Sequence, residues 1–432
     1  MGSSNGSSNV PRRPLRIAWL GAGPGMRESG GVPGVATDLL QGLARRGHRI
    51  DCLLPGRARE LPERVREERN IAFVWGTAER HRRRWYNRTR ITAFASGLLL
   101  RGVASVRLRR EVLRRHRQEP YDVIYQFSNI ESLAVPARLR RAVPLVIHPE
   151  THIRGELRFL ISERRLARRS QPTYAFVLAA LVMSVRAVVQ RRRIRHADLL
   201  VCISSVFRDH LVADCRFPIE RTVVIPNPVR LERFTESHGE RGEPPIVLVL
   251  GRVSVRKGVE DVVAVAHALL ERGVDARVRV VGGPSMWSDY TKLLDELPAE
   301  NAEYVGRIAP PEIPAELARS DVLLAASKYE PFGLTVAEAL AAGMPVVATS
   351  EVGAGEDVDA AVLARVRPGD VGAMASAIAE MLERLRAEPR ELRAVARAEA
   401  ERLFASERVC ERISGALETL LGGDGAPAGH PF

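Results

Sequence analysis

The stretch KYEPFGLTVAEALAAGMPVVAT, residues 328–349, predicts a turn, a helix and a strand in that order. Gly343 followed by Pro345 is a typical helix stop. The helix is expected to begin near Gly333 and Leu334, where the first-turn N–H groups have no acceptor inside the helix. These donors and the positive end of the helix dipole favour an anion such as phosphate. The stretch therefore predicts a phosphate site between two buried strands.

Two glutamates flank this turn. Glu338 lies three residues beyond Thr335, so its side chain projects from the same side as the first helical turn. A carboxylate there can accept two hydroxyl protons from a ribose whose diphosphate rests on the helix end. Glu330, before the turn, can reach a hydroxyl of the group that the phosphate carries. The alternative is a capping carboxylate and a surface glutamate, and for this spacing alone the alternative is the stronger.

The rest of the chain alternates β-rich runs with helical patterns, the rhythm of parallel sheets covered on both faces. We predict an α/β protein with two doubly wound, Rossmann-like domains and ligands at the carboxyl ends of the strands. The expected parts are a disordered tail over 1–14, a first domain over 15–235, a linker over 236–245, a second domain over 246–402 and a flexible tail over 422–432. The predicted strands are 15–20, 49–54, 71–75, 122–126, 144–148 and 199–205, then 246–250, 277–281, 322–327, 345–349 and 362–366.

Composition restricts the partners without naming one. The chain has 432 residues and a net charge of +13, which attracts anions of every kind. Its four cysteines show no CxxC spacing, so neither a zinc site nor a disulfide framework is indicated. The N-terminus lacks the apolar segment of a signal peptide. We expect a cytoplasmic protein.

Two basic helical stretches, 101–118 and 163–197, stand out in the first half. The second encloses an apolar run of about ten residues, too short to span a bilayer, which needs roughly 20. One interpretation is peripheral contact with an anionic membrane, on the inner face of the plasma membrane. The other is a core helix with a solvated, arginine-rich face. The sequence leaves both open.

Arg252 and Lys257 follow the predicted strand 246–250 at its carboxyl end. Cations fixed there would stabilise the charge of a departing diphosphate. Two solvated loop cations are the alternative. A dinucleotide motif is not supported after the first strand, because Met26 replaces the third glycine of the expected pattern after Gly21 and Gly23.

These segments together resemble the retaining GT-B glycosyltransferases of family 4. KYEPFGLTVAEALAAGMPVVAT is similar to the family's donor-site signature. LGRVSVRKGVEDVVAVAHAL (250–269), TVVIPNPVRLERF (222–234) and ADLLVCISSVFRDHL (197–211) resemble further family segments in the family's order. The resemblance covers about residues 15–421 and implies that a last helix, 403–421, packs back on the first domain.

The resemblance implies transfer from a nucleoside diphosphate sugar, with UDP or GDP as the nucleotide and no further cofactor. We expect the transfer to be metal-independent, because no aspartate stands in a metal-binding D-x-D. We expect no nucleic-acid partner. The acceptor is a hydroxyl compound: lipid-linked, polysaccharide or natural product. A histidine near the transferred sugar is expected, either His152 or His148. With these two, Arg252, Lys257 and Glu330 form the predicted catalytic set. The implied donor-binding residues are Gly30, Gly31, Arg252, Lys257, Gly306, Arg307, Ile308, Glu330, Phe332, Gly333, Leu334, Thr335 and Glu338.

Other functions remain as alternatives. A catalytically inactive nucleotide-sugar-binding protein would keep the donor site. A phosphorylase-like enzyme would need a lysine bound to pyridoxal phosphate, and a basic membrane- or nucleic-acid-binding protein would account for the charge, although no nucleic-acid-binding motif is recognisable. One segment departs from the family pattern, since Ala354 separates Gly353 from Gly355 where the family commonly has adjacent glycines and a glutamate.

Overall fold

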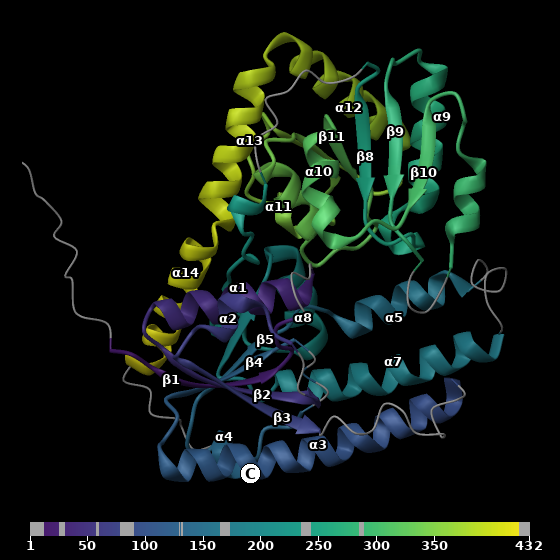
Figure 1. Ribbon diagram of the computed structural model, residues 1–432. Coiled ribbons are helices and arrows are strands. Elements are labelled where there is room, and N and C mark those ends of the chain that lie inside the picture. Colours follow the sequence, from purple (N-terminus) through teal and green to yellow (C-terminus); the bar gives the residue numbers. More distant parts are fainter. Residues whose placement is uncertain are drawn as a thin grey trace, which may run out of the picture.

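The computed structural model describes residues 13–25, 31–57, 60–77, 90–128, 130, 133–164, 173–234, 243–284 and 289–422. Two parallel sheets, each flanked by helices, form two domains stacked one above the other (Figure 1). This arrangement confirms the predicted α/β architecture with two doubly wound domains. Most of the predicted linker and tails lie outside the described residues.

The first domain has a seven-stranded sheet in the order β3-β2-β1-β4-β5-β6-β7, and every paired strand is parallel. Its strands are β1 Arg16–Gly21, β2 Arg49–Arg57, β3 Ile71–Thr77, β4 Val123–Phe127, β5 Leu145–His148, β6 Leu199–Cys202 and β7 Thr222–Val224. Its helices are α1 Val32–Arg45, α2 Glu63–Arg66, α3 Arg90–Gln118, α4 Ala137–Arg140, α5 Ile153–Ser162, α7 Thr173–Ile194 and α8 Ser205–Cys215.

The second domain has a six-stranded parallel sheet in the order β10-β9-β8-β11-β12-β13. Its strands are β8 Ile246–Leu250, β9 Arg277–Val281, β10 Ala302–Gly306, β11 Val322–Ala325, β12 Val346–Thr349 and β13 Leu363–Val366. Its helices are α9 Val259–Glu271, α10 Ile313–Ala318, α11 Leu334–Ala341 and α12 Val371–Ala387, followed by α13 Pro389–Phe404 and α14 Ser406–Gly422.

The chain crosses back to the first domain at its end. Helix α14 packs against α1, and its Cys410, Ile413 and Leu417 are buried in the same hydrophobic cluster as Trp19 of β1. Figure 1 shows α13 beside the second domain and α14 beside the first. The two domains are therefore joined twice along the chain, once before β8 and once between these helices.

Two strands escaped prediction. Both β7 and β10 are edge strands, and the residues of β7 are only half-buried. In β10, Tyr304 and Val305 are 38% and 37% exposed. Edge strands of this kind lack the continuous apolar run that identified the central strands. Helix α3 also begins at Arg90 rather than near residue 101.

Candidate functional site

The loop after β8 turns sharply to place Lys257 beside the end of β11. Gly258, the N-cap of α9, has a φ of 73°, and a Cβ there would overlap the Ala326 carbonyl oxygen. Only glycine allows this close approach without strain. The Lys328 amide donates to the Arg256 carbonyl oxygen at 2.8 Å, which ties the loop to the stretch that opens the donor signature.

Helix α11 begins at Leu334, as the sequence predicts, with Gly333 as its N-cap. Gly333 has a φ of 96°, and a Cβ there would crowd the Val352 side chain. The N–H groups of Leu334 and Thr335 lie in the first turn of the helix, so no carbonyl group of the same helix precedes them as an acceptor. Thr335 lines a cavity of about 30 Å³ together with Arg252 and Lys257. The helix N-terminus and the cations of the β8 loop therefore border one space.

Glu330 lies among these cations. Its carboxylate forms an ion pair with Lys257 and a second one with Arg256, whose Nη1 is 3.2 Å from Oε2. Arg256 also donates to the Tyr329 carbonyl oxygen at 2.7 Å. Burial opposes the charge of Glu330, yet Lys257 and Arg256 outweigh burial and hold its pKa below the ordinary value. Burial lowers the pKa of Lys257, and Glu330 opposes that shift.

Glu338 is in a different electrostatic environment. Its side chain is half-buried on the first turns of α11, and burial raises its pKa to about 7, with Arg233 acting in the opposite direction. No hydrogen bond to this carboxylate is formed within the described part of the chain. A ribose that donated hydroxyl protons to it would supply the missing partners and favour the ionised form.

The other predicted donor residues are divided between the two domains. Gly306 ends β10, and Arg307 and Ile308 follow it. The Gly306 carbonyl oxygen accepts from the Gly282 amide at 2.8 Å, so this segment lies at the same carboxyl edge as the β8 loop. Gly31, with a φ of 68°, is the exposed N-cap of α1 and faces open space. Gly30 lies outside the described residues.

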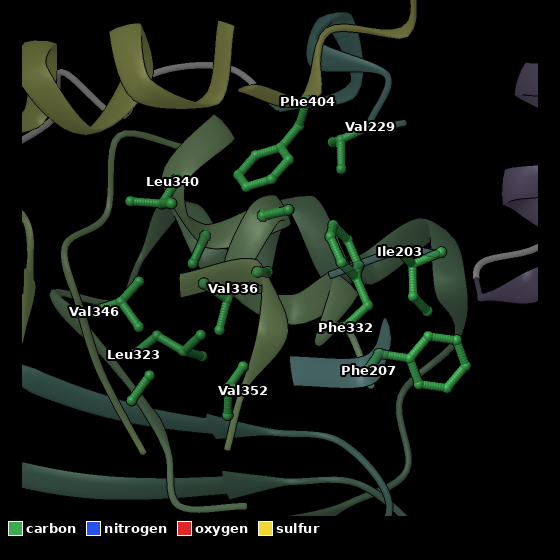
Figure 2. Close-up of a cluster of buried hydrophobic side chains, with 14 of the residues drawn as sticks. Ile203, Phe207, Val229, Leu323, Phe332, Val336, Leu340, Val346, Val352 and Phe404 are labelled. Atoms are coloured by element: carbon green, nitrogen blue, oxygen red, sulfur yellow. The ribbon is translucent and has the colours of Figure 1, made fainter. Parts of the chain in front are cut away.

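The Phe332 ring lies in the contact between the two domains. It is 3% exposed and packs against Phe404 at a centroid distance of 5.7 Å, inside a hydrophobic cluster that also holds Ile203 and Phe207 of the first domain (Figure 2).

Of the two predicted histidines, His152 is the one that the structure places against the donor signature. Its Nδ1 lies 3.1 Å from the Tyr329 hydroxyl and its Nε2 lies 3.2 Å from the Asp214 carboxylate. A carboxylate only accepts, so Nε2 carries the proton and Nδ1 accepts from Tyr329. Burial lowers the pKa of His152, opposed by Asp214. The ring is 1% exposed, with both nitrogens engaged in this arrangement.

His148 lies deeper, at the end of β5. Its Nδ1 is 2.6 Å from the Tyr125 hydroxyl, and its Nε2 is 3.4 Å from Glu150, which accepts from Asn227 at 2.7 Å. Burial lowers the pKa of His148 to about 3 and raises that of Glu150 to about 7. The His148–Glu150 contact is therefore one between an uncharged imidazole and a carboxyl group that titrates near neutrality, rather than an ion pair.

Sequence reasoning missed three participants. Arg256 directly precedes Lys257 in the sequence. A second cation beside a residue predicted to bind phosphate could have identified Arg256 as a further site residue. Asp214 and Tyr329 become partners of His152 only because α8 and the donor loop, residues 328–333, meet across the domain interface. The spacing of residues along the chain does not predict that His152 pairs with Asp214 and Tyr329.

Both parts of the chain match known families. Residues 29–233 match the model described as Glycosyltransferase Family 4, and residues 232–401 match the model described as Glycosyl transferases group 1. The chain belongs to the family 4 glycosyltransferases. This confirms the resemblance drawn from the donor signature.

Similarity to individual proteins agrees with this assignment. A glycogen synthase of Mycobacterium tuberculosis is 30% identical over 51% of this chain, and the chain spans about half, 53%, of that relative. The solved sucrose-phosphate synthase of Thermosynechococcus elongatus has a TM-score of 0.66 at 19% identity and covers 95% of this chain and 100% of its own. Anabaena HepE, solved with UDP-glucose, has a TM-score of 0.61 at 18% identity and covers 94% and 100%. These structures confirm the GT-B fold.

The raised pKa of Glu338 predicts a pH-dependent stability. The buried Glu338 carboxyl destabilises the fold when it is ionised. This destabilisation is absent below about pH 4.5, where the carboxyl is protonated in both folded and unfolded chains, and is complete above about pH 7. Without ligand, Glu338→Gln should therefore match the wild type in acid and exceed it by about 2 kcal/mol, a few degrees in Tm, at pH 8. Calorimetry between pH 5 and 8 measures the difference. Glu380→Gln, at an exposed position on α12, is the control and should show no such trend.

Proposed function

We propose that this chain transfers a sugar from a nucleoside diphosphate sugar to an acceptor hydroxyl, with retention of anomeric configuration and without a metal ion. One observation carries the proposal: Lys257 and the first turn of α11 border the same small cavity, although they follow different strands. A diphosphate is the ligand that uses both a fixed cation and free helical N–H groups. The nucleotide is UDP or GDP, and the UDP-glucose held by HepE supports UDP.

The residues divide the work by position. Lys257 and Arg252 stabilise the negative charge that grows on the departing diphosphate, and Glu338 accepts from ribose hydroxyls. Glu330 binds the sugar with one carboxylate oxygen while Lys257 and Arg256 hold the other. The acceptor attacks from the face that the diphosphate leaves, and a leaving phosphate oxygen takes the acceptor proton. His152, kept uncharged by burial, lies beside the donor loop through Tyr329.

Removal of the fixed cation tests this assignment. Lys257→Met should reduce kcat for transfer by about 10² to 10³, because the charge of the leaving group loses its nearest cation. Lys292→Met is the matched control, since Lys292 is an exposed lysine of the same domain. Binding of UDP-, GDP-, ADP- and TDP-sugars is measured first by thermal shift. The donors that bind are then tested in transfer assays with and without EDTA.

The transfer product and the effect of EDTA test the proposed retention of configuration and the proposed independence of metal ions. NMR of the new glycosidic bond should show the anomeric configuration of the donor, and EDTA should leave the rate unchanged. An inverted product would refute the proposed course of reaction. Binding of one donor without transfer to any acceptor would instead favour the inactive nucleotide-sugar-binding protein.

We further propose that the first domain rests on an anionic membrane when it meets its acceptor. Helix α7 is apolar on two sides. One side, with Ala179 and Met183, packs on α5. The other side is 47–75% exposed and comprises Tyr174, Val177, Leu178, Leu181, Val185 and Val188. Their positions, at i, i+3, i+4, i+7, i+11 and i+14, form one continuous stripe along the helix.

Exposed arginines lie one helical turn from exposed apolar side chains on both α7 and α3. Arg192 is exposed near the end of α7, and Arg107 and Arg110 are exposed on α3 beside the exposed Val103 and Val106. Figure 1 shows α5, α7 and α3 extending from the first domain in the same direction. Apolar side chains flanked by arginines suit the boundary between anionic headgroups and acyl chains. No helix among the described residues is long and apolar enough to cross a membrane.

Co-sedimentation with vesicles tests the membrane contact. The protein should bind phosphatidylglycerol vesicles at low salt, bind less as salt rises, and bind phosphatidylcholine vesicles weakly. The double variant Leu181→Glu, Val185→Glu should lose at least ~10-fold in binding. Leu270→Glu on α9, a similarly exposed leucine of the second domain, should bind like the wild type. Equal binding by the double variant, or none by the wild type at low salt, would contradict this account.

A further inference from the structure

The N-terminus of α8 is held from the other domain. Ser204 is its N-cap and accepts from the Phe207 amide at 3.1 Å. Its hydroxyl also donates to the Pro331 carbonyl oxygen at 2.8 Å, although Pro331 belongs to the donor loop of the second domain. Ser204 is 2% exposed. The same side chain therefore caps a helix of one domain and fixes the backbone of the other.

Glu356 completes the cap from the second domain. Its Oε2 accepts from the Ser205 amide at 2.6 Å and its Oε1 accepts from the Val206 amide at 2.7 Å. A carboxylate across the first N–H groups of a helix satisfies donors that have no partner inside the helix and meets the positive end of the helix dipole. Here the carboxylate lies 151 residues away in the chain from the first amide that it binds.

The loop before Glu356 is shaped for this contact. A Cβ on Gly353 would overlap both the Ser204 hydroxyl and the Pro331 carbonyl oxygen. The Gly353 amide donates to the Glu330 carbonyl oxygen at 3.3 Å, and the Ala354 amide donates to that of Phe332 at 2.7 Å. The segment in which Ala354 interrupts the expected glycine pair thus binds the donor loop on one side and α8 on the other.

Hydrophobic contacts run alongside these hydrogen bonds. Ile203 and Phe207 of the first domain share a buried cluster with Phe332 and Val352 of the second (Figure 2). The polar cap therefore lies beside buried apolar side chains, and Ser204 itself is buried, so its hydrogen bonds face little competition from water.

We propose that Glu356 and Ser204 are positioning residues that lock the donor loop onto the first domain. Neither is required to touch the sugar nucleotide. Ser204 holds the Pro331 carbonyl oxygen, and Glu356 holds in place the segment whose Ala354 amide binds the Phe332 carbonyl oxygen. Together they align the donor loop, directly before the phosphate-binding turn, with the domain that presents the acceptor. The effect on transfer rests on the proposed function, whereas the lock itself does not.

Amide exchange tests the lock without any substrate. In the full chain, Glu356→Ala should raise hydrogen–deuterium exchange by ~10-fold or more in peptides that cover 203–207 and 329–334, because the Ser205 and Val206 amides lose their acceptor. Glu356→Gln, which keeps one acceptor oxygen, should give a smaller increase. Asp357→Ala is the matched control, since it removes a neighbouring exposed carboxylate.

Kinetics then separate positioning from binding. Glu356→Ala should lower kcat/KM for transfer by about 10- to 100-fold, while UDP alone, which does not contact Glu356, should bind within about threefold of wild type. Exchange and kinetics equal to those of Asp357→Ala would overturn the proposal. If the wild type shows no transfer at all, the proposed function fails, but the exchange measurement still decides whether the lock exists.

Discussion

The site depends on positive charges that are held close together at the carboxyl edge of the second sheet. Lys257, Arg256 and the N-terminus of α11 are placed close together, and like charges held together without an anion repel each other. Glu330 supplies the anion in this structure through its two ion pairs. A diphosphate would bring further negative charge to the same place, so the site is prepared for a strongly anionic ligand.

Glycines make this concentration of charge sterically feasible. Gly258 lets the β8 loop approach Ala326, and Gly333 lets the donor loop approach Val352. Both have positive φ angles, which side chains other than glycine adopt only with strain. Gly353 has a different role, because it admits the Ser204 hydroxyl from the other domain. Close backbone approach therefore shapes both the proposed phosphate site and the contact between the domains.

Much of the fold and part of the site could be predicted from the sequence. The central strands are buried on both faces, and the start of α11 is marked by Gly333, so local patterns sufficed for them. The edge strands β7 and β10 are half exposed and left no such pattern. The Glu330 ion pairs, the His152–Asp214 contact and the Glu356 cap join residues far apart in the chain. These contacts form only because loops that follow separate strands meet in the folded protein. The hydrophobic periodicity of the sequence does not predict which loops meet.

A crystal structure of the complex with UDP would test the central claim most directly. The account predicts diphosphate oxygens within about 3 Å of Lys257 Nζ and of the Leu334 or Thr335 amides, with ribose hydroxyls on the Glu338 carboxylate. A diphosphate bound elsewhere, for example at the α1 N-terminus alone with Lys257 still paired only to Glu330, would contradict it.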